Sequence, residues 1–301
     1  MKPYSALPPP KINNLLLIGA GLIGGSLTLA LKQAGMVHHI IGMGRSATVM
    51  DEAVRLGVID AAVYRDTPEF IDAVKTADVI VLAMPVGQTR AVCELIAPHI
   101  QPDTLITDVG STKTSVYNDA HAALDDKIAQ FVLAHPIAGR EVNGPAAALA
   151  DLYVNKKVMI CPHAHNRAAD IDTVAALWQA TGANVYELSL AAHDEIFAAV
   201  SHLPHVLAYA LMNHVADSDL SNDKFAMAGA GFRDFTRIAA ASPEMWRDVC
   251  LANKDAILSE LDGYLTHAQQ LREMIADEDD KQLDAQFKKA SEKRLAWGSV
   301  Q

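Results

Sequence analysis

Three glycines near the start of the chain have the spacing of a phosphate-binding turn. Gly19, Gly21 and Gly24 form a G-x-G-x-x-G pattern directly after an apolar run and directly before a segment of helical period. In such a turn the first glycine permits a tight bend, the second lets the backbone approach a pyrophosphate, and the third lets helix and strand pack closely. The N-terminus of the following helix favours an anion. The pattern predicts a dinucleotide site that includes Leu22 and Ile23.

The stretch after the second expected strand indicates which dinucleotide is bound. Folds of this kind usually carry an Asp or Glu there, which binds the ribose 2′-hydroxyl of NAD. Residues 41–46 read IGMGRS and contain no acid. Arg45 and Ser46 offer a guanidinium and a hydroxyl to a 2′-phosphate instead, with a solvated surface arginine as the alternative. We therefore expect NADP to be favoured over NAD.

A second loop that could contact the dinucleotide follows the run Val79–Leu82. Parallel α/β sheets bind ligands beyond the carboxyl ends of their strands, and this apolar, β-branched run has the composition of such a strand. Met84, Pro85 and Val86 come shortly after it. We expect these three residues to line the adenosine and pyrophosphate side of the cleft.

The elements that must position these loops alternate as strand and helix from Asn14 to about Glu187. Short apolar runs rich in β-branched residues recur between longer segments of helical period, which is the pattern of βαβ units and a parallel sheet. Strands are expected at Leu15–Ile18, His39–Met43, Val79–Leu82, Leu105–Thr107, Phe131–Leu133, Val158–Ile160 and Val185–Glu187, and helices notably at Ile23–Gln33 and Val49–Leu56. We predict an α/β doubly wound (Rossmann) domain over residues 1–187.

The remaining residues, 188–301, have the pattern of an all-α domain. The strand signal stops, and apolar and charged residues recur at helical spacing over 191–216, 244–275 and 280–295. A kink is expected at Pro204, which lacks the N–H of a helix interior. Because so apolar a helical region needs a covering surface, we predict that it forms a homodimer. We also assign residues 188–301 as the substrate domain.

Composition excludes several classes of protein. The chain has 301 residues, of which 50% are hydrophobic and 20% charged, and its formal net charge is −11. This is an ordinary globular composition, and the negative charge repels nucleic acids and anionic membrane surfaces. We expect neither a nucleic acid nor a membrane as a partner, and we expect local arginines to hold any anionic substrate.

Cysteine usage and the N-terminus bear on the compartment. Cys93, Cys161 and Cys250 are odd in number and far apart, which disfavours a disulfide framework and favours a reducing compartment. Residues 1–10 contain one lysine and several prolines, without the apolar segment of a signal peptide. We expect a cytoplasmic protein without a membrane-spanning helix.

Eight short motifs follow one another along almost the whole chain. They are GAGLIGGS (19–26), AMPVGQ (83–88), DVGSTK (108–113), HPIAG (135–139), HD (193–194), SHLPH (201–205), GFRDFTRIA (231–239) and MWRD (245–248). The first two fit many nicotinamide enzymes, whereas the last four are specific. In this order the motifs resemble those of the prephenate and arogenate dehydrogenases of tyrosine biosynthesis.

The resemblance implies an oxidative decarboxylation, in which a hydride passes from C4 of a cyclohexadienol to NAD(P) while the ring carboxylate leaves as carbon dioxide. Prephenate would give 4-hydroxyphenylpyruvate, and arogenate would give tyrosine. By the family's pattern, His135 and Ser111 are catalytic: His135 accepts a hydrogen bond from the substrate 4-hydroxyl, which Ser111 supports. Arg237 is implied to bind a substrate carboxylate, with His205 near the substrate and Trp246 near the cleft.

The residues at the centre of this resemblance also have structural interpretations. His135 fits a loop histidine that merely satisfies its own hydrogen bonds. Ser111 fits the N-cap of the helix that follows it, and Arg237 fits a surface ion pair on a helix.

Other histidines raise the question of a metal. His202 and His205 are close in sequence, but Pro204 interrupts the helix between them, so we interpret them as supporting or structural groups and expect no metal. We interpret His163 and His165 as solvated loop residues.

Arg140 and Glu141 depart from the family's pattern, in which a small residue often follows HPIAG. Both stand near where the substrate side chain is expected, so we predict that they contact the substrate. Their charges leave the choice between prephenate, a ketoacid, and arogenate, an amino acid, open.

Two other functions fit parts of the sequence. An NADP-dependent β-hydroxyacid or imine reductase would share the two-domain plan, but it requires a catalytic lysine or its equivalent in the helical half and leaves GFRDFTR without a role. A non-catalytic NADP-sensing dimer would bind the dinucleotide but would not reduce it in the presence of prephenate.

Overall fold

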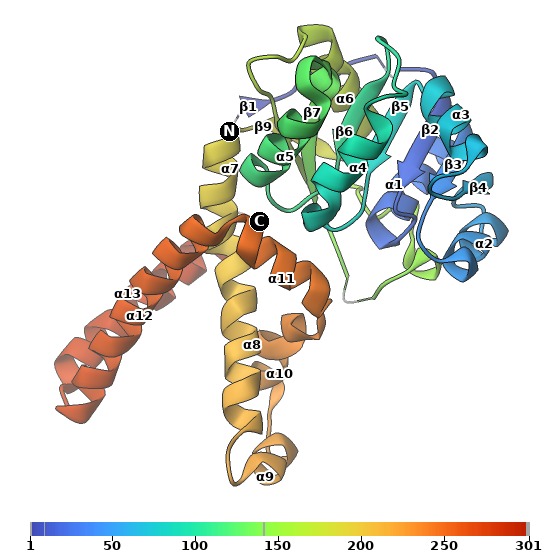
Figure 1. Cartoon of the computed structure of the whole chain (residues 1–301). Helices are drawn as coiled ribbons and strands as arrows, with labels where there is room; N and C mark the ends of the chain where they lie inside the picture. Colours follow the sequence, from blue (N-terminus) through green and yellow to red (C-terminus); the bar gives the residue numbers. More distant parts are fainter. Residues whose placement is uncertain (1, 9, 141, 299–301) are drawn as a thin grey trace. The chain divides into compact units, whose positions relative to one another are not determined.

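The computed structural model describes residues 2–8, 10–140 and 142–298, which pack as two compact units. The first unit extends to Lys254 and contains the sheet, and the second begins at Asp255 and is helical (Figure 1). The predicted domain boundary between residues 187 and 188 lies directly after the last strand of the sheet.

A single sheet runs through the described part of the first unit, with strand order β1-β9-β8-β7-β6-β5-β2-β3-β4. The strands are β1 Lys2–Pro3, β2 Ile12–Ile18, β3 Val37–Met43, β4 Ala61–Val63, β5 Val79–Leu82, β6 Leu105–Asp108, β7 Phe131–Ile137, β8 Lys157–Cys161 and β9 Asn184–Glu187. Every strand expected from the sequence is present. The pattern missed the edge strands β1 and β4, because two or three residues are too few to display a period.

Helices cover both faces of the sheet (Figure 1). They are α1 Leu22–Gln33, α2 Ala47–Arg55, α3 Pro68–Thr76, α4 Thr89–Ile96, α5 Thr114–Leu124 and α6 Ala168–Ala180, with the short 3-10 turns η1 Val86–Gln88, η2 Asp125–Gln130 and η3 Pro145–Ala147. One buried cluster includes α1 and α6, and another includes α3, α4 and α5. The predicted doubly wound α/β fold is confirmed.

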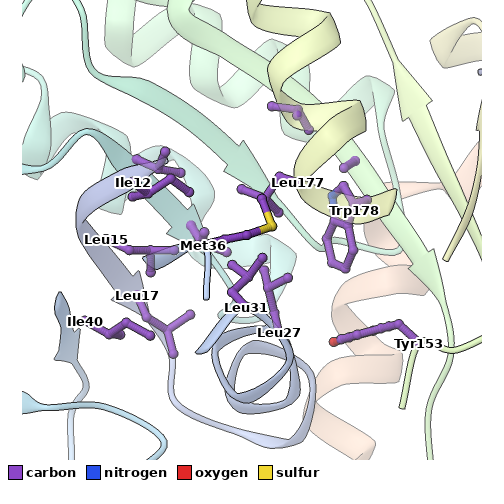
Figure 2. Close-up of a cluster of buried hydrophobic side chains, with 14 of the residues drawn as sticks. Ile12, Leu15, Leu17, Leu27, Leu31, Met36, Ile40, Tyr153, Leu177 and Trp178 are labelled. Atoms are coloured by element: carbon purple, nitrogen blue, oxygen red, sulfur yellow. The ribbon is translucent and has the colours of Figure 1, made fainter. Parts of the chain in front are cut away.

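Alternation along β2 shows how the sequence divides its apolar residues between these two clusters. Leu15 and Leu17 point to the cluster with α1 and α6, whereas Leu16 and Ile18 point to the other. In the first cluster Trp178 packs edge-to-face on Tyr153 (Figure 2). A strand buried on both faces in this way reads as a continuous apolar run.

The sheet is mixed, which corrects the expectation of a purely parallel one. β7 pairs antiparallel with β8, and β1 pairs antiparallel with β9, while the remaining pairs are parallel. Among the described residues between β7 and β8, which are 138–140 and 142–156, the structure has the short turn η3 and no crossover helix. The chain therefore returns beside β7 in the opposite direction.

A long, irregular helical stretch follows the sheet. It consists of α7 Leu190–Phe197, the π-helical turn η4 Ala198–His202 and α8 Leu203–Ala216. The irregularity expected at Pro204 is this π-turn, which lies just before the proline, and Pro204 itself stands in the first turn of α8. A proline is tolerated there because the missing N–H falls where the hydrogen-bonding pattern has already shifted.

By length and composition alone, Leu190–Ala216 could also cross a membrane. It carries the buried polar residues His193, Asp194 and His202, and the Asp194 carboxylate accepts a hydrogen bond from the backbone N–H of Lys113 in the sheet domain. One such helix is weak evidence for a membrane span, and these polar contacts make it part of the folded first unit.

Further helices complete both units. α9 Ser221–Ala226, α10 Ala230–Thr236, the 3-10 turn η5 Arg237–Ala240 and α11 Pro243–Ala252 belong to the first, and α12 Lys254–Ala276 and α13 Asp280–Gly298 make up most of the second. The segment 244–275, which has helical spacing in the sequence, is divided in the structure, because Asn253 separates α11 from α12. The side chain of Asn253 is buried and hydrogen-bonded within the first unit.

Candidate active site

A cavity of about 340 Å³ opens beyond the carboxyl ends of β2, β5, β6 and β7. This is the edge at which open α/β sheets of this strand order bind ligands. The expected site residues that line the cavity are Gly21, Leu22, Ile23, Met84, Pro85, Val86, Ser111, His135 and Arg140. Ser242 and Met245, from the start of α11, close its other side.

The glycine-rich turn after β2 has the geometry that its spacing predicts. Gly19 has φ of +103°, and a Cβ there would come within 2.5 Å of the Ala83 carbonyl oxygen. A Cβ on Gly24 would meet the Gly19 carbonyl oxygen at 2.5 Å, whereas Gly21 faces open space. The first turn of α1 has neither a side-chain cap nor an acidic residue, so its free amides can bind an anion. These features fit a dinucleotide pyrophosphate.

The loop after β3 holds Arg45 and Ser46 at the surface. The Arg45 guanidinium lies 4.0 Å from the Glu244 carboxylate of α11, and both side chains are exposed. The Ser46 hydroxyl caps α2 by accepting the backbone N–H of Val49 at 3.4 Å. Sequence reasoning anticipated Arg45 in this loop, but it gave no sign that an acid from α11 would pair with it.

His135, near the end of β7, is buried and hydrogen-bonded to a second histidine. Its Nδ1 lies 2.8 Å from Nε2 of His193, and Nδ1 of His193 lies 2.9 Å from the Asp194 carboxylate. Phe197 packs against both imidazoles. His135 lines the cavity while its Nδ1 is engaged away from it, so Nε2 is the nitrogen left for a ligand.

Asp194 connects the helical part of the first unit to the loop before α5. Its carboxylate accepts the backbone N–H groups of Lys113 and Thr114, both at 2.8 Å, and so caps α5. Its carbonyl oxygen accepts Nδ2 of Asn253 at 2.8 Å, and the same Nδ2 lies 3.2 Å from Nδ1 of His202. The N-cap alternative for Ser111 is therefore wrong, since the cap comes from a distant aspartate.

A buried ion pair fixes the strand that carries His135. Nζ of Lys113 binds the Asp108 carboxylate and donates to the Ala134 carbonyl oxygen at 2.7 Å. The other Asp108 oxygen accepts the N–H of Ala134 at 3.0 Å. β6 and β7 stop pairing at Val132, so these two side chains replace the backbone ladder just before His135. The DVGSTK motif contains both Asp108 and Lys113, but no sequence pattern predicted that this ion pair would bond to β7.

The polar groups of this network have shifted pKa values. Burial, together with His193 and Lys113, lowers the pKa of His135 well below 6.5, and burial likewise lowers that of His193. Burial and the neighbouring His193 lower the pKa of His202 to about 4. Burial acts to raise the pKa of Asp194, but its hydrogen bonds prevail and lower it to about 2. At neutral pH the histidines are neutral and Asp194 is an anion.

The cavity lining does not include the expected site residues His205, Trp246 and Arg237. The His205 ring stacks on Trp246 with 3.6 Å between ring centroids, and the buried indole N–H of Trp246 has no hydrogen-bond partner in the described part of the chain. Arg237 is exposed on η5, shortly before Ser242 of the lining. Glu141 lies outside the described residues.

Of the two loop histidines His163 and His165, the first is less solvated than expected. His163 is half-buried, and its Nε2 lies 2.8 Å from the Phe131 carbonyl oxygen, which corrects its interpretation as a solvated residue. His165 is exposed, as expected. Within residues 2–8, 10–140 and 142–298, no group of three or more His, Cys, Asp or Glu side chains is arranged to hold a metal ion.

The phosphate-binding turn, the strand order and the histidine-lined cavity define a dinucleotide-dependent dehydrogenase with a helical C-terminal part. The nucleotide-binding domain of prephenate dehydrogenase matches residues 27–187, and the dimerization domain of the same enzyme matches residues 189–289. The chain therefore belongs to the prephenate dehydrogenase family and is an NAD(P)-dependent oxidoreductase.

Individual relatives support this assignment over nearly the whole chain. Prephenate dehydrogenase of Bacillus subtilis is 37% identical, with 94% of this chain and 75% of that protein aligned. Cyclohexadienyl dehydrogenase of Zymomonas mobilis is 35% identical, with 94% and 95% aligned. The structure of A. aeolicus prephenate dehydrogenase with hydroxyphenyl propionate and NAD⁺ has a TM-score of 0.87 at 32% identity, covering 94% of this chain and 98% of that one.

More distant similarities concern the fold alone. A ketopantoate reductase structure from Ralstonia solanacearum matches with a TM-score of 0.51 at 15% identity, covering 86% of this chain and 98% of that one. The two-domain plan is therefore shared with other reductases, as the alternative reading of the sequence expected. The specific motifs and the full-length relatives separate this chain from them.

Proposed function

We propose that the chain oxidises and decarboxylates prephenate, arogenate or both, with His135 as the group that polarises the substrate 4-hydroxyl. The observation that carries the proposal is the position of His135: a buried, neutral imidazole that lines the cavity and has one nitrogen left for a ligand. Ser111 lines the same cavity and is proposed to support that hydroxyl.

The proposed chemistry needs a hydrogen-bond acceptor that is uncharged before the reaction. When bound, NAD(P) supplies the nicotinamide that accepts a hydride from C4. As the hydride leaves, the 4-hydroxyl becomes acidic, and a neutral His135 accepts its hydrogen bond or its proton. The ring carboxylate departs as carbon dioxide, and the electron pair of the broken bond completes the aromatic ring. His135 then returns the proton to the phenolate oxygen, so that no net proton is taken up.

Substrate binding is assigned to arginines and aromatic residues around the cavity. Arg140 lines it, and Arg237 is proposed to pair with a substrate carboxylate, because a negative protein must hold a dianion with local guanidinium groups. The stacked pair of His205 and Trp246 is proposed to border the substrate, and Glu141 to contact its side chain. These assignments leave prephenate and arogenate as the two candidate substrates.

The nucleotide is proposed to be held by residues 19–24 and by Met84, Pro85 and Val86, with Arg45 and Ser46 at the ribose. The free amides of α1 and the Arg45 guanidinium support this placement. NADP is proposed over NAD, since the loop after β3 offers a cation and no acid of its own.

We also propose that residues 1–187 bind the nucleotide and that residues 188–301 complete the substrate site and form a cytoplasmic homodimer. The match of residues 189–289 to a dimerization domain supports the assembly. Large exposed apolar side chains on the helices, such as Leu251 of α11 and Leu295 of α13, provide surface for it.

The test is an assay of the purified protein with prephenate and with arogenate, each with NAD and with NADP. We expect the absorbance of reduced nicotinamide to rise with at least one pairing, and to rise faster with NADP. Absence of reduction in all four mixtures, in a folded protein that binds the dinucleotide, would favour the non-catalytic sensing dimer and contradict the proposal.

A further inference from the structure

A chain of hydrogen bonds runs from the cavity to Asp194 through two histidines, and the proposed function does not use its inner members. We propose that His193, held by Asp194, is a positioning residue that fixes the proton of His135 on Nδ1 and so keeps Nε2 free as an acceptor. This inference rests on the proposed role of His135.

Among the three hydrogen-bonded groups, Asp194 is the one whose role as donor or acceptor follows from its other contacts. The Asp194 carboxylate is an acceptor, because it already receives two backbone N–H groups, from Lys113 and Thr114. The facing Nδ1 of His193 must therefore carry a hydrogen. A neutral imidazole has one N–H, so Nε2 of His193 is an acceptor. At 2.8 Å from that atom, Nδ1 of His135 must be the donor.

This assignment of hydrogens determines which tautomer His135 presents to the cavity. A neutral His135 that is protonated on Nδ1 has a lone pair on Nε2, which is the form that can accept a hydroxyl proton. The opposite tautomer would present an N–H to the substrate hydroxyl and could not polarise it. The orientation and tautomer of a buried histidine are commonly set by such a partner, and here the partner is a second histidine.

A second branch from Asp194 sets another histidine in the opposite state. Nδ2 of Asn253 donates to the Asp194 carbonyl oxygen and faces Nδ1 of His202, which must then be an acceptor. The hydrogen of His202 then falls on Nε2, a buried atom without a hydrogen-bond partner in the described part of the chain, while the backbone of Ser111 acts to raise the pKa of His202. Both branches thus give neighbouring histidines a defined and different tautomer, with Asp194 as their common anchor.

The chain also accommodates the proton that His135 accepts. When Nε2 takes the hydroxyl proton, the Nδ1–H of the imidazolium points at the His193 lone pair, and the Nδ1–H of His193 points at the Asp194 anion. The positive charge is therefore stabilised without any group leaving the site. When Nε2 gives the proton back to the phenolate oxygen, the original tautomers are restored.

Several charged or titratable groups face His193, so its neutrality depends on all of them. They come from β6, the loop before α5, β7, α7 and η4, and they are Asp108, Lys113, His135, Asp194 and His202. Burial and the Lys113 cation lower the pKa of His193, while the Asp108 and Asp194 carboxylates oppose this. The net lowering keeps His193 neutral, as the argument requires.

The first test is spectroscopic and uses the intact wild-type protein. Histidine labelled with ¹⁵N distinguishes protonated from unprotonated ring nitrogens, and comparison with a His135→Asn variant assigns the His135 signals among the 12 histidines. We expect an unprotonated Nε2 and a protonated Nδ1 for His135 at neutral pH. A protonated Nε2 in the neutral ring would overturn the proposal.

The second test separates kcat from KM in two variants. His193→Phe keeps the ring but removes the acceptor, so kcat should fall about 10- to 100-fold, part of the ~10²–10⁴ available to a positioned base, while KM for the dinucleotide stays unchanged. His193→Gln can accept from His135 and donate to Asp194, and it should recover most of kcat.

The matched control is His165→Phe. It removes an exposed imidazole whose ring neighbours are His121 and His163, not the residues of this network, and it should retain wild-type kcat. Wild-type kcat in His193→Phe, or a Gln variant as slow as the Phe variant, would contradict the positioning role. If instead the wild-type protein reduces neither dinucleotide with either substrate, the proposed function fails and the tautomer measured by ¹⁵N still stands as a separate result.

Discussion

At the scale of single residues, the sequence identified the side chains but not their states. The position of His135 in HPIAG indicated its role by resemblance, and the structure adds that it is buried, neutral and bonded to His193. Burial could not be foreseen, because it depends on Phe197 and His193, which lie more than fifty residues further along the chain. The His-Asp motif at 193–194 was the sequence signal of the two partners that follow His135 in this network.

Removing the imidazole of His135 should abolish most of the turnover. In His135→Asn, kcat should fall by about 10²–10⁴-fold, since an amide cannot act as a base, while dinucleotide affinity is retained. For the wild type, the sequence alone suggests an acid limb near pH 6.5, but the lowered pKa of His135 places it at lower pH. A pH profile of kcat/KM checks this, and a limb that stays at or above pH 6.5 would contradict it.

Arg45 and Glu244 should have opposite effects on the choice of dinucleotide. Arg45→Ala should raise KM for NADP by about 10- to 100-fold, the value of one charge-assisted hydrogen bond, and change KM for NAD little. Glu244→Gln should lower KM for NADP, because the carboxylate now competes with a 2′-phosphate for the guanidinium. Steady-state kinetics of each variant with NADP and with NAD give the two KM values. If Arg45→Ala changes KM for NADP and KM for NAD equally, Arg45 does not contact the ribose.

At the scale of elements, the sequence predicted the segments of regular period well, but it did not predict most of the places where a regular element ends or reverses. The buried strands β2, β5 and β6 each contain a short apolar run of the length and composition typical of a buried strand. The irregularity at Pro204 was expected and is the π-turn just before it. The reversal between β7 and β8 and the break at Asn253 were not predicted. Asn253, for example, ends α11 where its side chain bonds to the Asp194 carbonyl oxygen, a partner 59 residues away in sequence.

The junction of β6 and β7 should depend strongly on the buried Lys113. Lys113→Met removes the cation and leaves the Asp108 carboxylate buried without its ionic partner, which should lower the free energy of unfolding by about 3–5 kcal/mol. Lys127→Met is the control, because Nζ of Lys127 donates to the neutral Ala97 carbonyl oxygen rather than to a carboxylate, and it should cost about 1 kcal/mol. Urea unfolding measures both, and equal losses would show that the ion pair does not stabilise the junction.

At the scale of the whole molecule, the neutral buried histidines should make stability depend on pH. His135, His193 and His202 all have pKa values below 6.5 in the folded state, whereas unfolded histidines titrate near 6.5. Between these values the unfolded chain binds more protons than the folded protein. The contribution of the three histidines to stability is therefore fully present above pH 6.5 and is lost as pH falls toward their folded pKa values. For His202 this window reaches down to about 4.

The free energy of unfolding, measured by urea from about pH 7.5 to about pH 5, should therefore fall. Each such histidine contributes up to about 1.4 kcal/mol per pH unit, so His202→Leu should flatten the dependence by up to that amount. Asp194 does not contribute in this range, since its stabilising effect is lost only as pH falls below the ordinary carboxyl value of 3.8 toward about 2. A stability that is constant or rises as pH falls would contradict the neutral assignment of these histidines.

The central claim is that the cavity beside His135 transfers the hydride from C4 of a cyclohexadienol as the ring carboxylate departs. It is tested most directly with prephenate or arogenate carrying deuterium at C4, incubated with the wild-type protein and NAD or NADP. We predict that the reduced nicotinamide carries the deuterium and that one carbon dioxide is released for each dinucleotide reduced. Reduced nicotinamide without deuterium, or reduction without release of carbon dioxide, would contradict the account.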